Sequence, residues 1–309
     1  MRSLINIQDI EAFVAAAEAG SINRASVRLN LTQPATTRRI QNFEAAFGGD
    51  ALFDRSVKPA ILTALGNHVL EHCRRVLTTV AELEACATRS AGPTGELRVG
   101  VAHGLGEMVL TSPLDALRRS FPHVRMQVSA NWTTDLIEQV PGGAIDCAIG
   151  LITDAHRLPG GVRRLSVGTE RIVIVSSSSR ASTKPDGSPW RLRDLAEEGW
   201  FLNPRGCGCR AALERAFDRH NILIQVAAEI FGEDLQLSLL AQSGGLGLAP
   251  YRQLERSPHR AELRALDVAD FQLSATVTLV RNLVPSRFDP AIELLARQLK
   301  VKLQDSNGT

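Results

Sequence analysis

The feature that most constrains the fold is the stretch at residues 21–40, which predicts two short helices joined by a tight turn. Ser21 is a good N-cap for the first helix, because its hydroxyl can accept a hydrogen bond from an otherwise unpaired backbone N–H. Asn30 suits the left-handed position that ends this helix. Thr32 is expected to cap the second helix, and Pro34 lies in its first turn, where a missing N–H costs little. The stretch therefore predicts a helix pair with defined ends.

The second of these helices carries polar side chains where a core helix would carry apolar ones. Ile40 and Phe43 mark its buried side, while its first two turns project Gln, Thr and Arg. Such a helix is suited to reading base edges in a major groove and holding phosphates. Residues 24–39 contain four arginines and no acid. An ordinary solvated helix pair is the alternative for this stretch alone, and the flanking sequence decides between the two.

Length and composition limit the class of protein. A chain of 309 residues predicts two domains, or three, and 44% hydrophobic residues suffice for buried cores. No apolar run approaches the roughly 20 residues of a membrane span, and the N-terminus lacks the pattern of a signal peptide. The five cysteines, at positions 73, 86, 147, 207 and 209, are odd in number and scattered. We therefore expect a cytoplasmic protein with no membrane partner and no disulfide framework. The net charge is only +2, so affinity for DNA requires a local basic surface.

The segments on either side of the helix pair complete a small domain. Asn6 can cap a helix at about residues 7–19, whose apolar side chains recur at helical spacing. Residues 52–63 predict two short strands with Arg55 and Lys58 near the tip, a hairpin able to reach a phosphate or the minor groove. Taken alone, such a hairpin is an ordinary surface turn, but after this helix pair it favours a wing that contacts DNA.

The residue types predict roles at the DNA surface. Gln33 can bond an adenine edge, and Thr36 or Thr37 can touch a thymine methyl or a phosphate. Arg38 is the best candidate for a guanine or backbone contact. Any single one of these side chains has the alternative of facing solvent. The full set of candidate DNA-binding residues is Ser21, Arg24, Thr32, Gln33, Pro34, Ala35, Thr36, Thr37, Arg38, Arg39, Arg55 and Lys58, of which Arg24, Arg55 and Lys58 are expected to hold phosphates.

A long helix follows the hairpin. Thr63 is expected to cap it, and it should reach to about Arg89, which is about 26 residues or about 39 Å. Its apolar residues recur at alternating steps of three and four, the repeat of a coiled-coil seam, which predicts a dimerisation helix. The alternative is that the helix packs against another domain of its own chain. The seam residues are Leu62, Leu65, Val69, Cys73, Val76, Val80, Leu83 and Ala87.

Beyond a hinge at residues 91–95, strands and helices alternate, which predicts two α/β lobes. The first lobe has predicted strands at 97–101, 124–130 and 146–150 and helices at 108–120 and 134–140, and its strand order favours a parallel sheet. A strand at 171–175 leads out of it into a second lobe. That lobe has predicted strands at 200–202, 224–230 and 247–250 and helices at 210–220 and 235–242. A strand at 273–280 is expected to return to the first sheet, covered by a helix at about 290–299. Two lobes linked by crossing strands leave a cleft, which is the natural place for a small ligand.

Five short motifs add a likeness to a known family. They are FVAAAEAGS at 13–21, LTQPA at 31–35, LFDR at 52–55, LTALG at 62–66 and AQSGGLGLAP at 241–250. With these motifs in this order, the chain resembles a LysR-type transcriptional regulator along essentially its whole length. The N-terminal motifs are highly specific and the C-terminal motif is moderately so. The chain departs from the family at Ala25-Ser26, where two alanines are usual, and at Thr36-Thr37, which replaces the commoner Leu-Ser and bears on which bases are read.

The resemblance implies an architecture and a set of partners. It implies a winged helix-turn-helix at residues 1–63, a linker helix at 64–90 and an effector domain like a periplasmic binding protein at 91–309. The first lobe of that α/β domain would span about 95–168 and 272–302, and the second lobe about 169–271. The resemblance also implies a dimer through the linker helix, or a tetramer, that bends promoter DNA, with RNA polymerase as a further partner. A small-molecule effector of unknown identity would shift the DNA contacts.

By the same resemblance, effectors lie between the lobes at strand ends and helix N-termini. Unpaired N–H groups at helix starts suit a carboxylate or another anion, so an anionic metabolite is expected. His103 is unusual at its position and can bind an anion or change its charge near neutral pH, and the alternative is a partly exposed structural histidine. The candidate effector-binding residues are Ala102, His103, Gly104, Asn131, Trp132, Thr133, Leu202, Asn203, Pro204, Phe231 and Gly247.

The sequence Gly-Cys-Gly-Cys-Arg at 206–210 has two interpretations. Two cysteines at a helix start can have a lowered thiol pKa, which would make Cys207 and Cys209 a redox sensor or a metal site. The two cysteines supply only two metal ligands, and the sequence shows no convincing further ligands for zinc. A disulfide between two residues this close in the chain would be strained. The default interpretation is an ordinary glycine-rich loop, and thiol-redox or metal sensing is the alternative.

Two other classes of protein compete with a regulator. An enzyme is disfavoured because the chain has no phosphate loop, no Gly-x-Ser-x-Gly elbow, no His-Glu-x-x-His and no dinucleotide fingerprint. A solute-binding protein would share the two-lobed domain but would have no use for residues 1–90. We therefore expect a protein that is not an enzyme and has neither a catalytic residue nor a bound metal or cofactor.

Overall fold

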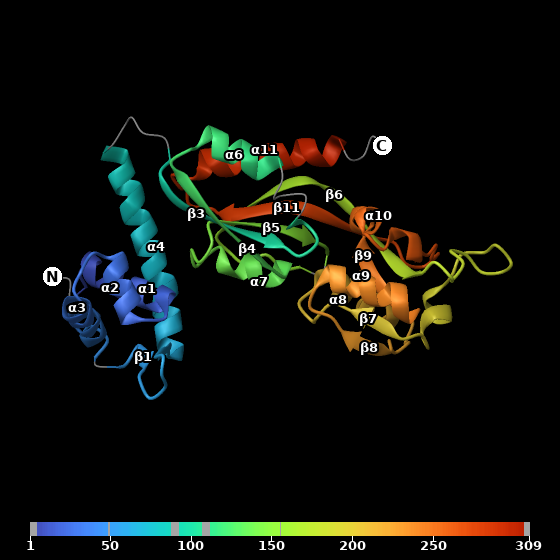
Figure 1. The fold of residues 1–309 in the computed structure, drawn as a ribbon, viewed down its shortest axis with the longest axis horizontal. Coiled ribbons are helices and arrows are strands. Elements are labelled where there is room, and N and C mark those ends of the chain that lie inside the picture. The colour runs from blue at the N-terminus through green and yellow to red at the C-terminus, as the bar shows by residue number, and fades with distance from the viewer. Residues whose placement is uncertain (1–4, 49, 88–92, 107–111, 155, 306–309) are drawn as a thin grey trace. The chain divides into compact units, whose positions relative to one another are not determined.

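The computed structural model describes residues 5–48, 50–87, 93–106, 112–154 and 156–305 (Figure 1). The chain divides into two compact units, one formed by residues 1–91 and the other by most of residues 92–309. The predicted limits of the linker helix and the effector domain stay predictions. Within the described residues, no helix is long and apolar enough to cross a membrane.

The N-terminal unit has the predicted helices and hairpin. They are α1 (Ile7–Ala19), α2 (Ile22–Arg28), α3 (Gln33–Ala45), β1 (Phe53–Asp54), β2 (Ile61–Leu62) and α4 (Ala64–Ala87). The caps follow from the sequence, since Asn6 Oδ1 accepts Gln8 N at 2.9 Å and Thr63 Oγ1 accepts Gly66 N at 3.0 Å. Thr32 caps α3, and Asn30 has the predicted positive φ of 53°. The predicted end of α4 near residue 89 lies outside the described residues.

Ser21 differs from the prediction made for it. It holds the N-cap position of α2 with an extended backbone, but its hydroxyl makes no cap hydrogen bond. The helix instead starts through the Ser21 carbonyl, which accepts Ala25 N at 3.0 Å. The position of the cap was therefore predicted correctly, and the role of the hydroxyl was wrong.

The core of the N-terminal unit is aromatic and takes in the start of α4. The ring of Phe13 packs on Phe43 at 5.1 Å and on Phe53 at 5.5 Å between centroids. Val69 and Cys73 of the predicted coiled-coil seam are buried in this same core. These two seam residues therefore pack within their own chain, which corrects the prediction that the whole seam faces a second copy. Val76 and Leu83 further along α4 remain 43% and 72% exposed.

The C-terminal unit is built on a nine-stranded mixed sheet with the order β4-β3-β5-β11-β6-β9-β7-β8 and with β10 paired to β6. Its strands are β3 (Gly95–Ala102), β4 (Val124–Asn131), β5 (Cys147–Ile152), β6 (Val162–Ser177), β7 (Trp200–Leu202), β8 (Val226–Glu229), β9 (Leu246–Pro250), β10 (Leu263–Ala265) and β11 (Leu273–Asn282). β3 pairs with β4 and β5 in parallel, as predicted. β11 returns antiparallel to β5 and β6, so the two crossing strands are confirmed.

The helices of this unit cover the sheet. They are α6 (Ser112–Ser120), α7 (Thr133–Gln139), α8 (Gly208–Asp218), α9 (Glu233–Ser243), α10 (Tyr251–Arg256) and α11 (Asp289–Asp305). Figure 1 shows α6 beside α11, which packs along β6. α7 lies against β3 and β5, where two glycines allow a close approach: a Cβ at Gly100 would lie 2.6 Å from Leu136, and one at Gly150 would lie 2.7 Å from Thr133. Residues 107–111, at the start of the helix predicted at 108–120, lie outside the described residues.

Strand β6 is much longer than predicted. It runs for 16 residues from Val162, whereas the sequence predicted a strand only at 171–175. Its first half alternates poorly and only Val167 of its first eight residues is buried, so its sequence pattern does not show that it pairs with β11 along its whole length. Helix α10 and strand β10 were not predicted either, because each is short.

Candidate functional site

The exposed side of α3 carries the side chains expected at a DNA surface. Thr32 Oγ1 accepts Ala35 N at 3.4 Å, which starts the helix and leaves its first turn facing outward. Gln33 and Arg38 are exposed, and Thr37 is half-buried. Arg24 on α2 is also exposed. These side chains have the exposure that base and phosphate contacts require, and their roles stay predictions.

Two residues of the predicted set instead hold α3 in place. Thr36 is completely buried, and its hydroxyl donates to the Thr32 carbonyl at 3.2 Å. It cannot reach a base from this position, so Thr37 is the better of the two threonine candidates. Arg39 donates through Nη2 to Gln8 Oε1 at 2.9 Å and so ties α3 to α1.

The wing is attached to α3 by a buried carboxylate. The side chain of Glu44 is 10% exposed, and its Oε1 accepts Leu52 N at 3.1 Å and Phe53 N at 3.4 Å. Its Oε2 pairs with Arg55 Nη2 at 2.6 Å, while the Arg55 side chain stays 53% exposed. Arg55 therefore positions the hairpin as well as offering charge at its surface. Lys58 lies exposed at the tip.

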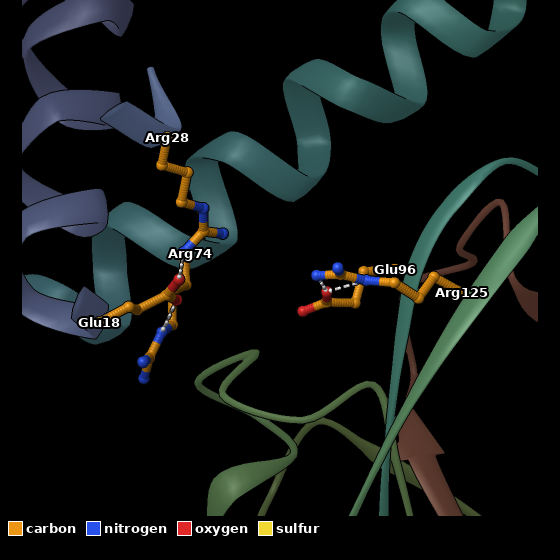
Figure 2. A network of polar contacts seen from close by, with 5 residues as sticks. All are labelled: Glu18, Arg28, Arg74, Glu96 and Arg125. Atoms are coloured by element: carbon orange, nitrogen blue, oxygen red, sulfur yellow. Dashed lines mark hydrogen bonds and ion pairs between the residues drawn. The ribbon is translucent and has the colours of Figure 1, made fainter. Parts of the chain in front are cut away.

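Glu18 joins three helices of the same unit. Figure 2 shows its carboxylate between Arg28 of α2 at 2.9 Å and Arg74 of α4 at 3.3 Å. Arg28 is one of the arginines counted in the basic stretch, and this ion pair gives it a structural partner. The roles of Glu18 and Glu44 were not predicted from the sequence, since their partners lie 8 to 56 positions away in the chain.

Within the C-terminal unit, a pocket lies where strands β3, β4 and β7 end and helix α8 begins. Its empty volume is about 410 Å³, a figure that includes the part open to solvent. Of the predicted effector residues, Ala102, His103, Trp132, Thr133 and Asn203 line it. The other lining residues are Leu151, Ile172, Cys207, Gly208, Cys209, Leu248, Ala249 and Pro250.

The remaining predicted effector residues lie outside this lining. Phe231 is 72% exposed, and the close packing of α9 explains Gly247, since a Cβ there would lie 2.6 Å from Leu240. Asn131 uses its Oδ1 to accept Trp132 N at 2.8 Å. Gly104, Leu202 and Pro204 are also outside the lining. The prediction missed the residues from β6 and β9 because apolar strand residues at a pocket look like ordinary core residues in a sequence.

The polar groups of the lining are largely engaged by the fold. Thr133 Oγ1 accepts Leu151 N at 3.2 Å, and Asn203 Nδ2 donates to the Ile230 carbonyl at 3.4 Å. His103 and Trp132 lie against each other with ring centroids 4.6 Å apart and form one wall.

A buried arginine fixes the floor of the pocket. Arg210 is 5% exposed and donates through Nη1 to the Asn203 carbonyl at 2.8 Å. Its guanidinium also pairs with Glu214 at 2.8 Å and Glu229 at 2.5 Å. Arg210 therefore links β7, β8 and α8, although the side chains of Glu214 and Glu229 are 31% and 41% exposed.

The two cysteines at the start of α8 differ from the other described cysteines. Cys207 is the N-cap residue of α8. The pKa of Cys207 is lowered to about 7, and the largest cause is the interaction of its thiol with the Cys209 side chain. The nearby N–H groups of Arg210 and Cys209 lower this pKa further, while burial raises it. Burial raises the pKa of Cys73 to about 11 and raises that of Cys147 still further.

The first turn of α8 is also contacted from the other lobe. Thr134 Oγ1 donates to the Gly206 carbonyl at 3.1 Å, and Thr153 Oγ1 donates to the Gly208 carbonyl at 3.4 Å. The ring of His156 lies directly on Gly208, where a Cβ would meet Cε1 at 1.8 Å. Its Nδ1 accepts Thr153 N at 3.0 Å, and burial lowers the pKa of His156.

Two family models match the chain, one over its N-terminal part and one over its C-terminal part. The family described as "Bacterial regulatory helix-turn-helix protein, lysR family" matches residues 7–67, and the "LysR substrate binding domain" matches residues 90–303. The HTH-type transcriptional regulator YofA of Bacillus subtilis is 28% identical over 257 residues, 82% of this chain and 85% of that protein. The uncharacterized HTH-type transcriptional regulator YnfL of Escherichia coli is 26% identical over 281 residues, 89% and 92% of the two chains.

Solved structures show the same fold. A full-length OxyR variant from Pseudomonas aeruginosa superposes with a TM-score of 0.76 at 17% identity, covering 96% of this chain and 95% of that chain. The structure of full-length CbnR complexed with its target DNA superposes with a TM-score of 0.59 at 21% identity, covering 96% and 100%.

Proposed function

The chain belongs to the LysR family of DNA-binding transcriptional regulators, and we propose that a small molecule bound in the pocket changes how it contacts promoter DNA. The observation that carries the DNA-binding part of this proposal is the exposed start of α3, where Gln33 and Arg38 project from a helix capped by Thr32. The wing, held by Glu44, adds Arg55 and Lys58 as phosphate contacts. A solute-binding protein would have no use for this unit.

The assembly we propose is a dimer through α4, with two dimers forming a tetramer. Val76 and Leu83 support it, since large apolar side chains exposed along one helix favour burial against a partner. The CbnR structure holds that protein with its target DNA, and we propose promoter DNA as the partner here. RNA polymerase is a further proposed partner, and the cytoplasm is the proposed location.

The ligand of the pocket is proposed from its lining. The N-terminus of α8 favours an anion, which supports the expected anionic metabolite. Among the described residues, the lining contains no Lys or Arg to pair with such an anion, and most of it is apolar. Thiol-based or metal sensing is the second candidate, and it is favoured by the presence of Cys207 and Cys209 in the lining and by the lowered pKa of Cys207.

DNA binding is tested with the purified full-length protein. We expect it to retain the region upstream of its own gene in preference to random duplex of equal length. Arg38→Ala should weaken this binding by about 1–3 kcal/mol, the usual cost of losing one base or phosphate contact. Arg193→Ala, an exposed arginine of the C-terminal unit, is the matched control and should bind as the unchanged protein does. Equal affinity for both duplexes would refute the proposal, and an unchanged affinity of Arg38→Ala would remove Arg38 from the contacts.

A further inference from the structure

Two cysteines separated by one residue, Cys207 and Cys209, lie at the start of α8. Gly206 has a φ of 124°, and Gly208 leaves room for the His156 ring, so both glycines have structural reasons. Arg210 holds the pocket floor. Cys207 occupies an N-cap position, where Ser, Thr, Asp or Asn would stabilise the helix better. Cys209 also packs against the hydrophobic core of the C-terminal unit, so Cys207 is the one of the two whose presence the fold does not explain.

The two thiols form a pair that faces a cavity. Cys207 is the N-cap residue of α8 and Cys209 lies in its first turn, and both residues line the pocket. In the part of the chain that the structure describes, the rest of the lining has no Lys, Arg, Asp or Glu, and Leu151, Ile172 and Leu248 make part of it apolar. Two adjacent sulfur atoms in an apolar pocket suit a soft ligand that prefers sulfur to oxygen.

The number of ligands narrows the class of metal ion. A structural zinc site takes four protein ligands, and a catalytic one takes three. Within the described residues, no group of three or more His, Cys, Asp or Glu side chains lies close enough to hold a metal ion. A soft monovalent cation such as Cu(I) prefers thiolate ligands, and two sulfur atoms are enough to coordinate it linearly.

We propose that Cys207 and Cys209 together bind one soft monovalent cation of the Cu(I) class, which would make this cation the signal that the pocket senses. The inference rests on the proposed regulator and names the ligand class of its pocket. In the binding step, two S–H bonds are replaced by two bonds from sulfur to the metal, and the thiol protons pass to solvent. The metal keeps its oxidation state, so no oxidant or reductant takes part.

The site also has the electrostatics that such a complex needs. A bis-thiolate complex of a monovalent cation carries one net negative charge, and it would lie at the N-terminus of the 11-residue helix α8, where the helix dipole stabilises negative charge. The other described cysteines, Cys73 and Cys147, are buried in cores with raised pKa values and are poor competitors.

The test is a titration of the reduced, full-length protein with Cu(I) in the absence of oxygen, against a chromophoric Cu(I) chelator. We expect one Cu(I) per protomer and an ultraviolet band from thiolate-to-copper charge transfer. Cys207→Ser and Cys209→Ser should each weaken binding by more than about 100-fold, beyond what the loss of a supporting contact costs. Cys147→Ala is the matched control and should bind as the unchanged protein does. Thermal unfolding of each variant shows whether it is folded.

The outcomes separate this inference from the proposed function. Binding that survives in Cys207→Ser, or no binding in competition with the chelator, overturns the cation site. Thiols that react with peroxide or iodoacetamide but take up no Cu(I) also overturn it and make the pair a modification site. DNA retention by the metal-free protein tests the regulator separately, so loss of Cu(I) binding with retained DNA binding refutes the cation site alone.

Discussion

Replacing Glu44 with alanine is expected to release the wing from α3. Glu44 Oε1 is the acceptor for Leu52 N at 3.1 Å and Phe53 N at 3.4 Å, and both of these residues are buried. Each buried N–H left without an acceptor costs about 1–3 kcal/mol, which gives about 2–6 kcal/mol for the two. Because the second bond is long, we expect a value near the lower end, about 3 kcal/mol. Arg55 is 53% exposed and can be solvated, so its lost ion pair adds only about 0–1 kcal/mol.

Hydrogen exchange at the backbone amides of the hairpin measures this effect locally. A loss of about 3 kcal/mol in the free energy of local opening corresponds to exchange that is roughly 100-fold faster, since about 1.4 kcal/mol is a factor of ten. Glu44→Gln keeps an acceptor for both amides and should lose about 1 kcal/mol or less. If the alanine and glutamine variants exchange at the same rate, the backbone bonds do not hold the wing, and the reasoning is wrong.

Three further predictions follow from other contacts. Gly208→Ala should lower the free energy of unfolding by about 1–3 kcal/mol, because the added Cβ would force the His156 ring away from the Thr153 amide. Calorimetry of the unfolding transition of the C-terminal unit measures this loss, and an unchanged Tm would show that the ring does not pack there. Leu83→Glu should weaken self-association more than about tenfold, because it places a charge on the exposed apolar side of α4. Analytical ultracentrifugation measures this, and unchanged association would show that the dimer contact lies elsewhere. Alkylation of Cys207 by iodoacetamide should accelerate as the pH rises through about 7, because the thiolate is the nucleophile and the pKa of Cys207 is lowered to about 7. If the midpoint of the pH–rate profile lies near the ordinary pKa of a thiol, the thiolate is not stabilised.

The sequence predicted the N-terminal unit better than the pocket because local chemistry determines its elements. The caps at Asn6, Thr32 and Thr63 and the left-handed Asn30 depend on neighbours within a few positions, and the structure confirms them. Thr36 shows the limit of this approach. It is polar and lies among DNA-facing residues, but the packing of α3 buries it, and a single sequence does not show that burial.

The pocket was harder to predict because its lining comes from strands that are far apart in the sequence. Strand ends and helix starts identified His103, Trp132 and Asn203, which belong to the parallel βα units. Ile172 and Leu248 belong to the crossing strand β6 and its neighbour β9, whose pairing depends on long-range contacts.

The hydrogen bonds around the first turn of α8 contribute a free energy similar in magnitude to the coupling between two binding sites in an allosteric protein. Thr134 and Thr153 bond the carbonyls of Gly206 and Gly208, which flank Cys207 in the chain. A neutral hydrogen bond contributes about 0.5–1.5 kcal/mol, so the two together contribute about 1–3 kcal/mol. That range matches the coupling free energies typical of allosteric proteins, about 1–3 kcal/mol. Because this turn supplies both the pocket lining and the acceptors for the other lobe, a ligand that moves it must change those hydrogen bonds.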